Sequence, residues 1–218
     1  MKNIIFIAPP AAGKGTQSKL VSGEYNIPHI STGDLLRYEV STGSQLGKFI
    51  KSEMDLGNLI SDDIMVNLLR KRISQVDCNN GYILDGYPRN LEQAKVYENL
   101  LHDLGIEIGN VIFLDIDMQL ALKRTISRLV CGTCGASFNR TDEKLCPKIE
   151  GICDKCGHLL KVRSDDNEET FVNRFNTYVN STKPLLDYYR SKGLLKSVKI
   201  HETDTVDDIF AKIKNLID

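Results

Sequence analysis

The stretch Ala8-Pro9-Pro10-Ala11-Ala12-Gly13-Lys14-Gly15-Thr16 lies between the apolar run Ile4–Ile7 and a helix-like segment that begins at Gln17. A glycine-rich turn between a strand and a helix lets backbone N–H groups converge on phosphate oxygens at the positive end of the helix. In such a loop Lys14 reaches the outer phosphates and Thr16 can hold Mg2+. The stretch therefore predicts a P-loop that binds a nucleoside triphosphate.

Two positions depart from the pattern G-x-x-x-x-G-K-[ST]. Ala8 stands at the first glycine, and Ala11 stands where a further glycine is common. Alanine is the smallest substitute, so the backbone can still approach phosphate unless either position needs a positive φ. The alternative is a tight strand-to-helix turn that merely contains Gly-Lys-Gly, and the strand–loop–helix context favours the P-loop.

Length and charge narrow the class of protein. The chain has 218 residues, 26% of them charged, and a formal net charge of -1. This length suits one α/β domain with insertions. The charge balance gives no reason to expect bulk attraction to nucleic acid or membrane. The apolar runs are far shorter than a membrane span, and no secretory signal is evident. We therefore expect a cytoplasmic protein whose cysteines stay reduced.

Short strands alternate with helices along the chain. This alternation indicates a parallel sheet with helices on both faces and ligands beyond the carboxyl ends of the strands. We predict an α/β, P-loop three-layer fold with a parallel sheet of about five strands. The strand candidates are Asn3–Ile7, Ile27–Ile30, Tyr82–Leu84, Val111–Asp115 and Ser197–Ile200. The helix candidates are Asp62–Gln75, Leu91–Leu104, Met118–Val130, Glu168–Ser191 and Val206–Leu216.

Two stretches interrupt the alternation. Ser31–Ile60 inserts polar, helix-like sequence, and Cys131–Arg163 is rich in Gly, Cys, Asp and Lys with little periodicity. A connection that long inside a compact domain is usually a lid or a small module.

Four cysteines form two C-x-x-C pairs, Cys131 with Cys134 and Cys153 with Cys156, eighteen residues apart. Each pair followed by glycine is typical of a zinc knuckle. Two disulfides or four unrelated buried thiols are the alternatives. Four thiolates leave no coordination position for water, so a structural zinc is predicted. Cys146 and His158 complete no knuckle and are expected to be ordinary residues of this segment, and Cys78 a small buried hydrophobe.

Arginines recur beside the predicted ligand edge. Arg124 and Arg128 are four apart in a predicted helix and would share one face. Any single one can be a solvated surface residue, but their coincidence with the P-loop and with glycine-rich turns favours phosphate binding. The set is Arg37, Arg89, Arg124, Arg128, Arg163 and Arg174.

These motifs together resemble the adenylate kinases, in the longer form with a zinc-bearing lid, and the match covers essentially the whole chain. Ile30-Ser31-Thr32-Gly33-Asp34-Leu35-Leu36-Arg37 and Leu84-Asp85-Gly86-Tyr87-Pro88-Arg89 are highly specific to nucleoside monophosphate kinases. The resemblance also rests on Gly13-Lys14-Gly15-Thr16-Gln17, Arg124 with Arg128, the two knuckles and Arg163-Ser164-Asp165-Asp166-Asn167.

The resemblance implies a division of the chain and a reaction. A core P-loop domain would comprise residues 1–30, 61–126 and 165–218, a helical AMP-binding insertion 31–60, and a zinc-binding lid 127–164. The reaction implied is reversible transfer from MgATP to AMP, giving two ADP. A monomer is expected, with ATP and AMP as partners and neither nucleic acid nor membrane.

The resemblance also implies roles for individual residues. Phosphoryl transfer needs positioning and charge neutralisation, which Lys14 and the arginines can supply. Asp85 resembles the Walker B acid that acts on Mg2+ through water, Asp34 shares that shell, and Asp165 and Asp166 pair with basic groups to latch the lid. The catalytic set is Lys14, Asp85, Arg89, Arg124, Arg128, Arg163 and Arg174. ATP would be bound by Ala11, Ala12, Gly13, Lys14, Gly15, Thr16, Arg124, Arg128, Ser137, Phe138 and Asp204. AMP would be bound by Thr32, Arg37, Leu59, Ile60, Gly86, Arg89, Gln93, Arg163 and Arg174.

For Phe138 two roles remain open, and for the histidines a catalytic role is not expected. Phe138 either stacks on the ATP adenine or forms the small core of the lid, and at Asp204 the family uses the backbone. The AMP phosphate is already an anionic nucleophile at pH 7, so no general base is needed. Surface or capping positions are therefore expected for His29, His102, His158 and His201.

Two other functions remain possible from the sequence. A kinase for UMP, CMP or GMP would share the P-loop and the arginines, although Gln93, Thr32 and the zinc lid favour AMP. A P-loop switch or nucleic-acid-binding protein is the alternative from a different class. Against it, Thr182-Lys183-Pro184-Leu185 fails the N/T-K-x-D guanine motif, and the zinc segment carries both signs of charge.

Overall fold

The structure is a computed structural model that describes residues 2–55, 60–142, 144–162 and 166–218. Its centre is a five-stranded sheet in the order β2-β3-β1-β4-β8, and every neighbouring pair is parallel. The predicted α/β fold with a parallel five-stranded sheet is thus confirmed. The strands are β1 (Lys2–Ile7), β2 (His29–Ser31), β3 (Gly81–Asp85), β4 (Asn110–Ile116) and β8 (Leu195–Ile200).

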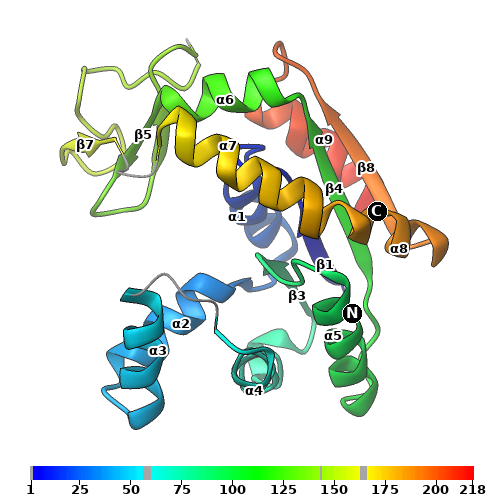
Figure 1. The fold of residues 1–218 in the computed structure, drawn as a ribbon. Coiled ribbons are helices and arrows are strands. Elements are labelled where there is room, and N and C mark those ends of the chain that lie inside the picture. The colour runs from blue at the N-terminus through cyan, green and yellow to red at the C-terminus, as the bar shows by residue number, and fades with distance from the viewer. Residues whose placement is uncertain (1, 56–59, 143, 163–165) are drawn as a thin grey trace.

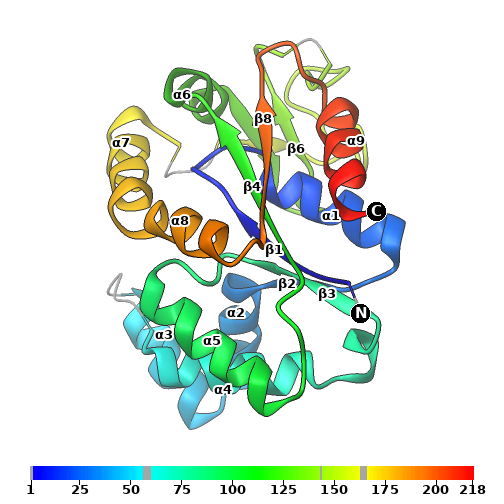
Figure 2. The same cartoon turned by 90° about the vertical axis from the view of Figure 1, so that its right-hand side faces the viewer.

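Helices cover both faces of the sheet (Figure 2). They are α1 (Lys14–Tyr25), α2 (Thr32–Ser41), α3 (Gln45–Asp55), α4 (Asp62–Ile73), α5 (Leu91–Asp103), α6 (Met118–Ile126), α7 (Glu168–Thr177), α8 (Pro184–Ser191) and α9 (Val206–Ile217), with a 3-10 turn at Val76–Cys78.

Alternating residues of the central strand build the two halves of the core. In β1, Ile5 and Ile7 belong to a buried cluster with α4, α5 and α8, whereas Ile4 and Phe6 belong to one with α1 and α9. Successive side chains of a strand point to opposite faces, so a strand buried on both sides reads as a continuous apolar run. The result is a three-layer arrangement of helices, sheet and helices.

Register brings the predicted ligand-binding motifs to one edge. Phe6 of β1 pairs with Asp85 of β3, and Asp85 pairs in turn with Ser31 of β2. Because these strands are parallel, the segments that follow them emerge together at their carboxyl ends. The P-loop, the segment after Ser31 and the segment after Asp85 therefore lie side by side.

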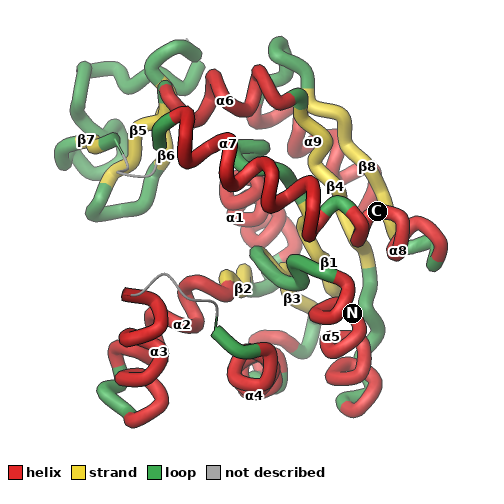
Figure 3. Tube along the Cα trace, in the orientation of Figure 1, coloured by secondary structure: helices red, strands yellow, loops and turns green. Residues whose placement is uncertain are grey.

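Two segments extend from the sheet on the same side (Figure 1). Helices α2 and α3 follow β2, where the helical insertion is predicted. The cysteine-rich segment forms an antiparallel three-stranded sheet in the order β6-β5-β7, with strands β5 (Arg128–Cys131), β6 (Ser137–Asn139) and β7 (Leu160–Lys161). Much of the rest of that segment is loop (Figure 3).

The helix predicted for Met118–Val130 is wrong at its end. Helix α6 stops at Ile126, and Arg128 opens β5, so Arg124 and Arg128 do not share one helical face. The Ser127 hydroxyl donates to the carbonyl of Lys123, and Leu129 pairs with Phe138 of β6. Strand pairing within the cysteine-rich segment thus outweighs the local helical spacing.

The single helix predicted for Glu168–Ser191 is also divided. Helix α7 passes through a π-helical turn, η2 (Tyr178–Thr182), before α8 begins at Pro184. Proline has no N–H to donate and its ring clashes with the carbonyl four residues earlier, so it fits the first turn of a new helix. The helix predicted to start at Gln17 begins earlier, at Lys14.

No helix in the described part of the chain is both long enough and apolar enough to cross a membrane.

Candidate functional site

The loop after β1 has the geometry of an anion cradle. Gly13 adopts a left-handed conformation with φ 84° at the N-cap of α1. A methyl group built on Gly13 or Gly15 would meet no described atom within 4 Å, so the loop opens onto free space. The positive end of α1 points at this space, where a phosphate group would be stabilised.

The two alanines of the loop differ in conformation. Among described non-glycine residues, a positive φ is confined to Ala11, at 59°, and Asn26. Ala11 therefore occupies a position that favours glycine, whereas Ala8 does not. A left-handed conformation costs an alanine about 1–2 kcal/mol.

Ala11→Gly is expected to leave stability unchanged or raise it by up to about 1.5 kcal/mol. Relief of the strained φ outweighs the roughly 0.5–1 kcal/mol by which glycine favours the unfolded chain. Ala8→Gly is the matched control and should lose roughly that 0.5–1 kcal/mol, because it relieves no strain. Urea unfolding of both variants measures the difference, and equal destabilisation by both would contradict this account of Ala11.

Lys14 and His29 both contact the Asp85 carboxylate beside the loop. Lys14 Nζ lies 2.9 Å from Asp85 Oδ1, and His29 Nε2 lies 3.0 Å from Asp85 Oδ2. The Asp85 side chain is only 15% exposed. Desolvation acts to raise the pKa of Asp85, but the hydrogen bond of His29 and the charge of Lys14 outweigh it and lower that pKa to about 2. Asp85 is thus a carboxylate at neutral pH.

Residues that follow β2 and β3 contact one another at the carboxyl ends of these strands. The Thr32 hydroxyl donates to the Gly86 carbonyl at 3.4 Å, and Arg89 Nε donates to the same carbonyl at 2.7 Å. The N–H of Arg89 donates to Gln93 Oε1 at 2.8 Å. The structure thus brings Thr32, Gly86, Arg89 and Gln93 together.

Helix α2 carries Arg37 toward the same region. Ser31 caps the helix by accepting from the N–H of Asp34, and the Arg37 guanidinium pairs with the Asp34 carboxylate. Arg37 keeps 63% of its side chain exposed. It is therefore accessible to an anion. Leu59, Arg163 and Asp165 lie outside the described residues. Ile60 immediately precedes Ser61, the N-cap of α4.

Two more arginines flank the P-loop. Arg128 and Arg174 line a small recess together with Pro10, Ala11 and Phe171. Desolvation lowers the pKa of Arg89, the Asp85 carboxylate raises it, and the Arg174 guanidinium lowers it. Arg89 and Arg174 therefore share one electrostatic environment, in which added negative charge would be stabilised.

Arg128 is already engaged by an acid. Its Nε donates to Asp166 Oδ2 at 2.8 Å, and its Nη2 pairs with Asp166 Oδ1. The Asp166 side chain is fully buried. The predicted pairing of Asp166 with a basic group is confirmed, and it joins the base of the cysteine-rich sheet to the segment before α7.

Arg124 and Asp204 interact electrostatically. Desolvation lowers the pKa of Arg124, while Asp142, Asp204 and Glu202 raise it. The Asp204 carboxylate accepts from Lys212 Nζ at 2.7 Å and from the N–H of His201 at 2.8 Å. The side chain of Asp204 therefore has a structural role, in keeping with the expectation that only its backbone faces a ligand.

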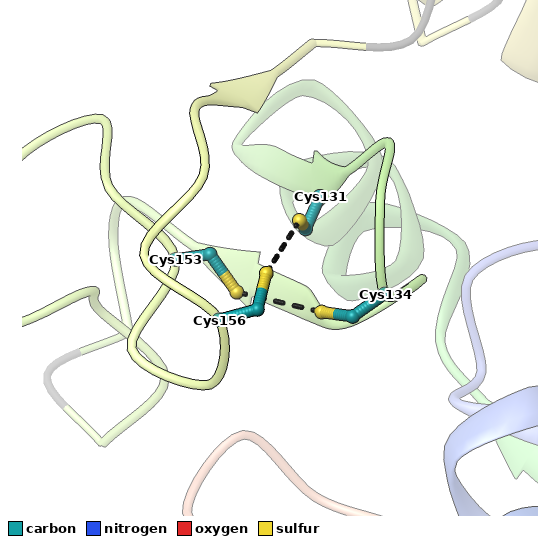
Figure 4. A group of neighbouring side chains, drawn as sticks. All are labelled: Cys131, Cys134, Cys153 and Cys156. Carbon is teal, nitrogen blue, oxygen red and sulfur yellow. Dashed lines mark hydrogen bonds between the residues drawn. The ribbon is translucent and has the colours of Figure 1, made fainter.

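The four knuckle cysteines converge on one point (Figure 4). Their sulfur atoms all lie within 4.8 Å of one another, with Cys131 Sγ 3.4 Å from Cys156 Sγ and Cys134 Sγ 3.6 Å from Cys153 Sγ. Zinc–sulfur bonds of about 2.3 Å in a tetrahedron would separate the sulfurs by about 3.8 Å. The donor set and spacing therefore fit a four-thiolate zinc site.

The cysteine-rich segment has a small core of its own. The Phe138 ring packs against Cys131, Ala136 and Cys153, which is the second of the two roles considered for it. The ring is only half-buried, so its exposed part stays accessible to a base. Ser137 precedes Phe138 on β6 and is exposed. Three of the six residues in this small core are knuckle cysteines: Cys131, Cys153 and Cys156.

Two residues of the site have roles that the sequence does not predict. His29 is wrongly expected at the surface, since its side chain is only 19% exposed and contacts Asp85. Asp62 accepts a hydrogen bond from Gln93 Nε2 at 2.8 Å. The contact of His29 with Asp85 could have been suspected from the sequence. His29 lies just before the Ser31 motif, on a strand that pairs with the strand ending at Asp85.

Comparison with known proteins agrees with this geometry. The family model for adenylate kinase matches residues 6–194. An adenylate kinase of Clostridium tetani is 40% identical over 215 residues, which cover 99% of this chain and 98% of the relative. An adenylate kinase of Clostridioides difficile is 42% identical, covering 96% and 95%, and one of Bacillus cytotoxicus is 43% identical, covering 99% and 98%. With a P-loop, a cluster of arginines and relatives that match along nearly their whole length, the chain belongs to the adenylate kinase family.

Proposed function

We propose that this chain catalyses reversible phosphoryl transfer from MgATP to AMP, giving two ADP. The observation that carries the proposal is the meeting of two anion-binding regions at one sheet edge. The P-loop with Lys14 forms one, and Thr32, Gly86 and Arg89 form the other. Two nucleotides whose phosphates meet between them would be positioned for direct transfer.

Charge neutralisation is the main catalytic contribution. We assign Lys14 to the β- and γ-phosphates of ATP and Arg37 with Arg89 to the AMP phosphate. Arg124, Arg128, Arg163 and Arg174 are assigned to the transferring group. For Arg128 this requires either the remaining Nη1 or release from Asp166 when the lid closes. Such groups stabilise charge without chemistry of their own, which is what phosphoryl transfer requires.

Asp85 and Thr16 would hold Mg2+ with the triphosphate. The buried Asp85 carboxylate stays ionised and lies within reach of Lys14. Bound Mg2+ neutralises charge on the phosphates. Asp34 is the further candidate, although its carboxylate pairs with Arg37.

Base recognition is assigned to the segments around α2, α4 and α5. Thr32, Leu59, Ile60, Gly86 and Gln93 would surround the AMP adenine. On the other side, Ala11, Ala12, Gly13, Gly15, Ser137, Phe138 and the backbone of Asp204 would complete the ATP site.

We propose the division into a core of residues 1–30, 61–126 and 165–218, an AMP-binding insertion 31–60 and a lid 127–164. Closure of the lid would exclude water from the transferring group. The four cysteines would hold structural zinc, and we propose a cytoplasmic monomer that binds neither nucleic acid nor membrane.

A coupled assay with ATP and either AMP, CMP, UMP or GMP tests the substrate. The highest kcat/KM is expected for AMP, because an amide side chain can pair with the adenine edge at two points. Turnover of CMP, UMP or GMP above that of AMP would replace this proposal by another nucleoside monophosphate kinase.

A further inference from the structure

Asp62 and Arg89 hold the two ends of one amide. Gln93 is in the first turn of α5, where its N–H donates to the capping Asn90 side chain at 2.8 Å. Its Oε1 accepts from the backbone N–H of Arg89 at 2.8 Å, and its Nε2 donates to Asp62 Oδ1, also at 2.8 Å. Asp62 comes from a different element, the first residue of α4. The amide is therefore held between two segments.

We propose that Asp62 is a positioning residue that sets base specificity by fixing the orientation of the Gln93 amide. This inference rests on the proposed function, in which Gln93 faces the purine of the monophosphate. It assigns the substrate class as a 6-aminopurine nucleotide and the rejected class as 6-oxopurine nucleotides.

The hydrogen-bonding chemistry of Asp62 and of the Arg89 N–H allows only one orientation of the Gln93 amide. A carboxylate only accepts hydrogen bonds, and a backbone N–H only donates. A flipped amide would place its oxygen against the Asp62 carboxylate and its N–H groups against the Arg89 N–H. The flipped state therefore loses two hydrogen bonds and gains two repulsive contacts.

The oxygen and the nitrogen of the Gln93 amide can each form one more hydrogen bond, to a base. The oxygen has two lone pairs and the nitrogen two hydrogens, and the protein uses one of each. The remaining lone pair and hydrogen present an acceptor beside a donor. Adenine offers a 6-amino donor beside a ring-nitrogen acceptor, which complements this edge. A 6-oxopurine offers an oxygen acceptor beside an N–H donor and would need the flipped amide.

Kinetics of Asp62→Asn with AMP and with IMP test the inference. An asparagine can present either its oxygen or its amino group, so residue 62 no longer opposes the flipped Gln93 amide and only the Arg89 N–H still does. The ratio of kcat/KM for AMP to that for IMP is expected to fall about tenfold, the lower end for one charge-assisted hydrogen bond. The change should lie in KM for the monophosphate, with KM for ATP unchanged.

Asp63→Asn is the matched control. Asp63 is the next residue in the same first helical turn and is exposed, so its replacement removes the same charge at nearly the same distance from the helix end. Its AMP-to-IMP ratio is expected to equal that of the unaltered protein. An equal fall in both variants would assign the effect to charge and overturn the inference.

Gln93→Leu provides a second, independent variant. It should lose the same discrimination, because the base-reading amide is gone. Full discrimination in Gln93→Leu, or an unchanged ratio in Asp62→Asn, would overturn the inference while AMP-dependent ADP formation by the unaltered protein upholds the proposed function. Absence of that ADP formation would instead refute the proposed function itself.

Discussion

Lys14→Ala is expected to lower kcat/KM for ADP formation by about a hundredfold or more, while the protein remains folded. Lys14 is the cation at the start of α1 whose Nζ contacts Asp85 at the end of β3. In the proposed site it bonds two phosphates of ATP. Charge-assisted hydrogen bonds contribute roughly 1.5–3 kcal/mol each, so the loss of two corresponds to about two to four decades.

Lys19→Ala is the control for this variant. Lys19 is an exposed lysine on the same helix, so its removal changes the net charge equally without touching the P-loop. Near-normal kinetics are expected for it, and circular dichroism of both variants checks the fold. Near-normal turnover by Lys14→Ala would contradict the assignment of Lys14 to the phosphates.

Cys153→Ser is expected to lower the melting temperature by on the order of 10 °C and to abolish stoichiometric zinc. Cys153 is 1% exposed and belongs both to the cysteine cluster and to the core of the lid. Zinc in small modules contributes an apparent ~10–16 kcal/mol, of which only part is coupled to unfolding of the whole chain. For a chain of this length about 1 kcal/mol shifts the melting temperature by roughly 2–4 °C.

Cys146→Ser is the matched control, because it removes an exposed thiol from the same segment. It should leave the melt and the metal content unchanged. The comparison uses the metal-loaded protein, with zinc measured by elemental analysis and chelator added in parallel. No zinc in the purified protein, together with a melt that chelator leaves unchanged, would defeat the proposed metal site.

The sequence predicts those features of the fold and of the site that depend on hydrophobic burial and on the spacing of motifs. Each of the five central strands overlaps a strand predicted from the sequence. Because parallel strands share an orientation, the motifs after Ile7, Ile30 and Leu84 lie at one edge of the sheet. The cysteine cluster follows from its two C-x-x-C pairs. These features are local or depend only on the order of strands.

Pairings between distant segments could not be predicted in the same way. The spacing of Arg124 and Arg128 favours one helix, yet pairing with β6 and β7 turns Arg128–Cys131 into a strand. The contact of His29 with Asp85 joins residues 56 positions apart. The hydrogen bond of Gln93 to Asp62 depends on the packing of α4 against α5. The positive φ at Ala11 follows from loop geometry, which composition alone does not determine.

The fate of the γ-phosphate tests the central claim most directly. ATP labelled in its γ-phosphate is incubated with AMP and Mg2+, and the products are separated. We predict two ADP for each ATP consumed, with the label in the β-position of the ADP formed from AMP and little free phosphate. Release of labelled phosphate to water at a rate independent of AMP would contradict the account, because the site would then hydrolyse ATP rather than join two nucleotides.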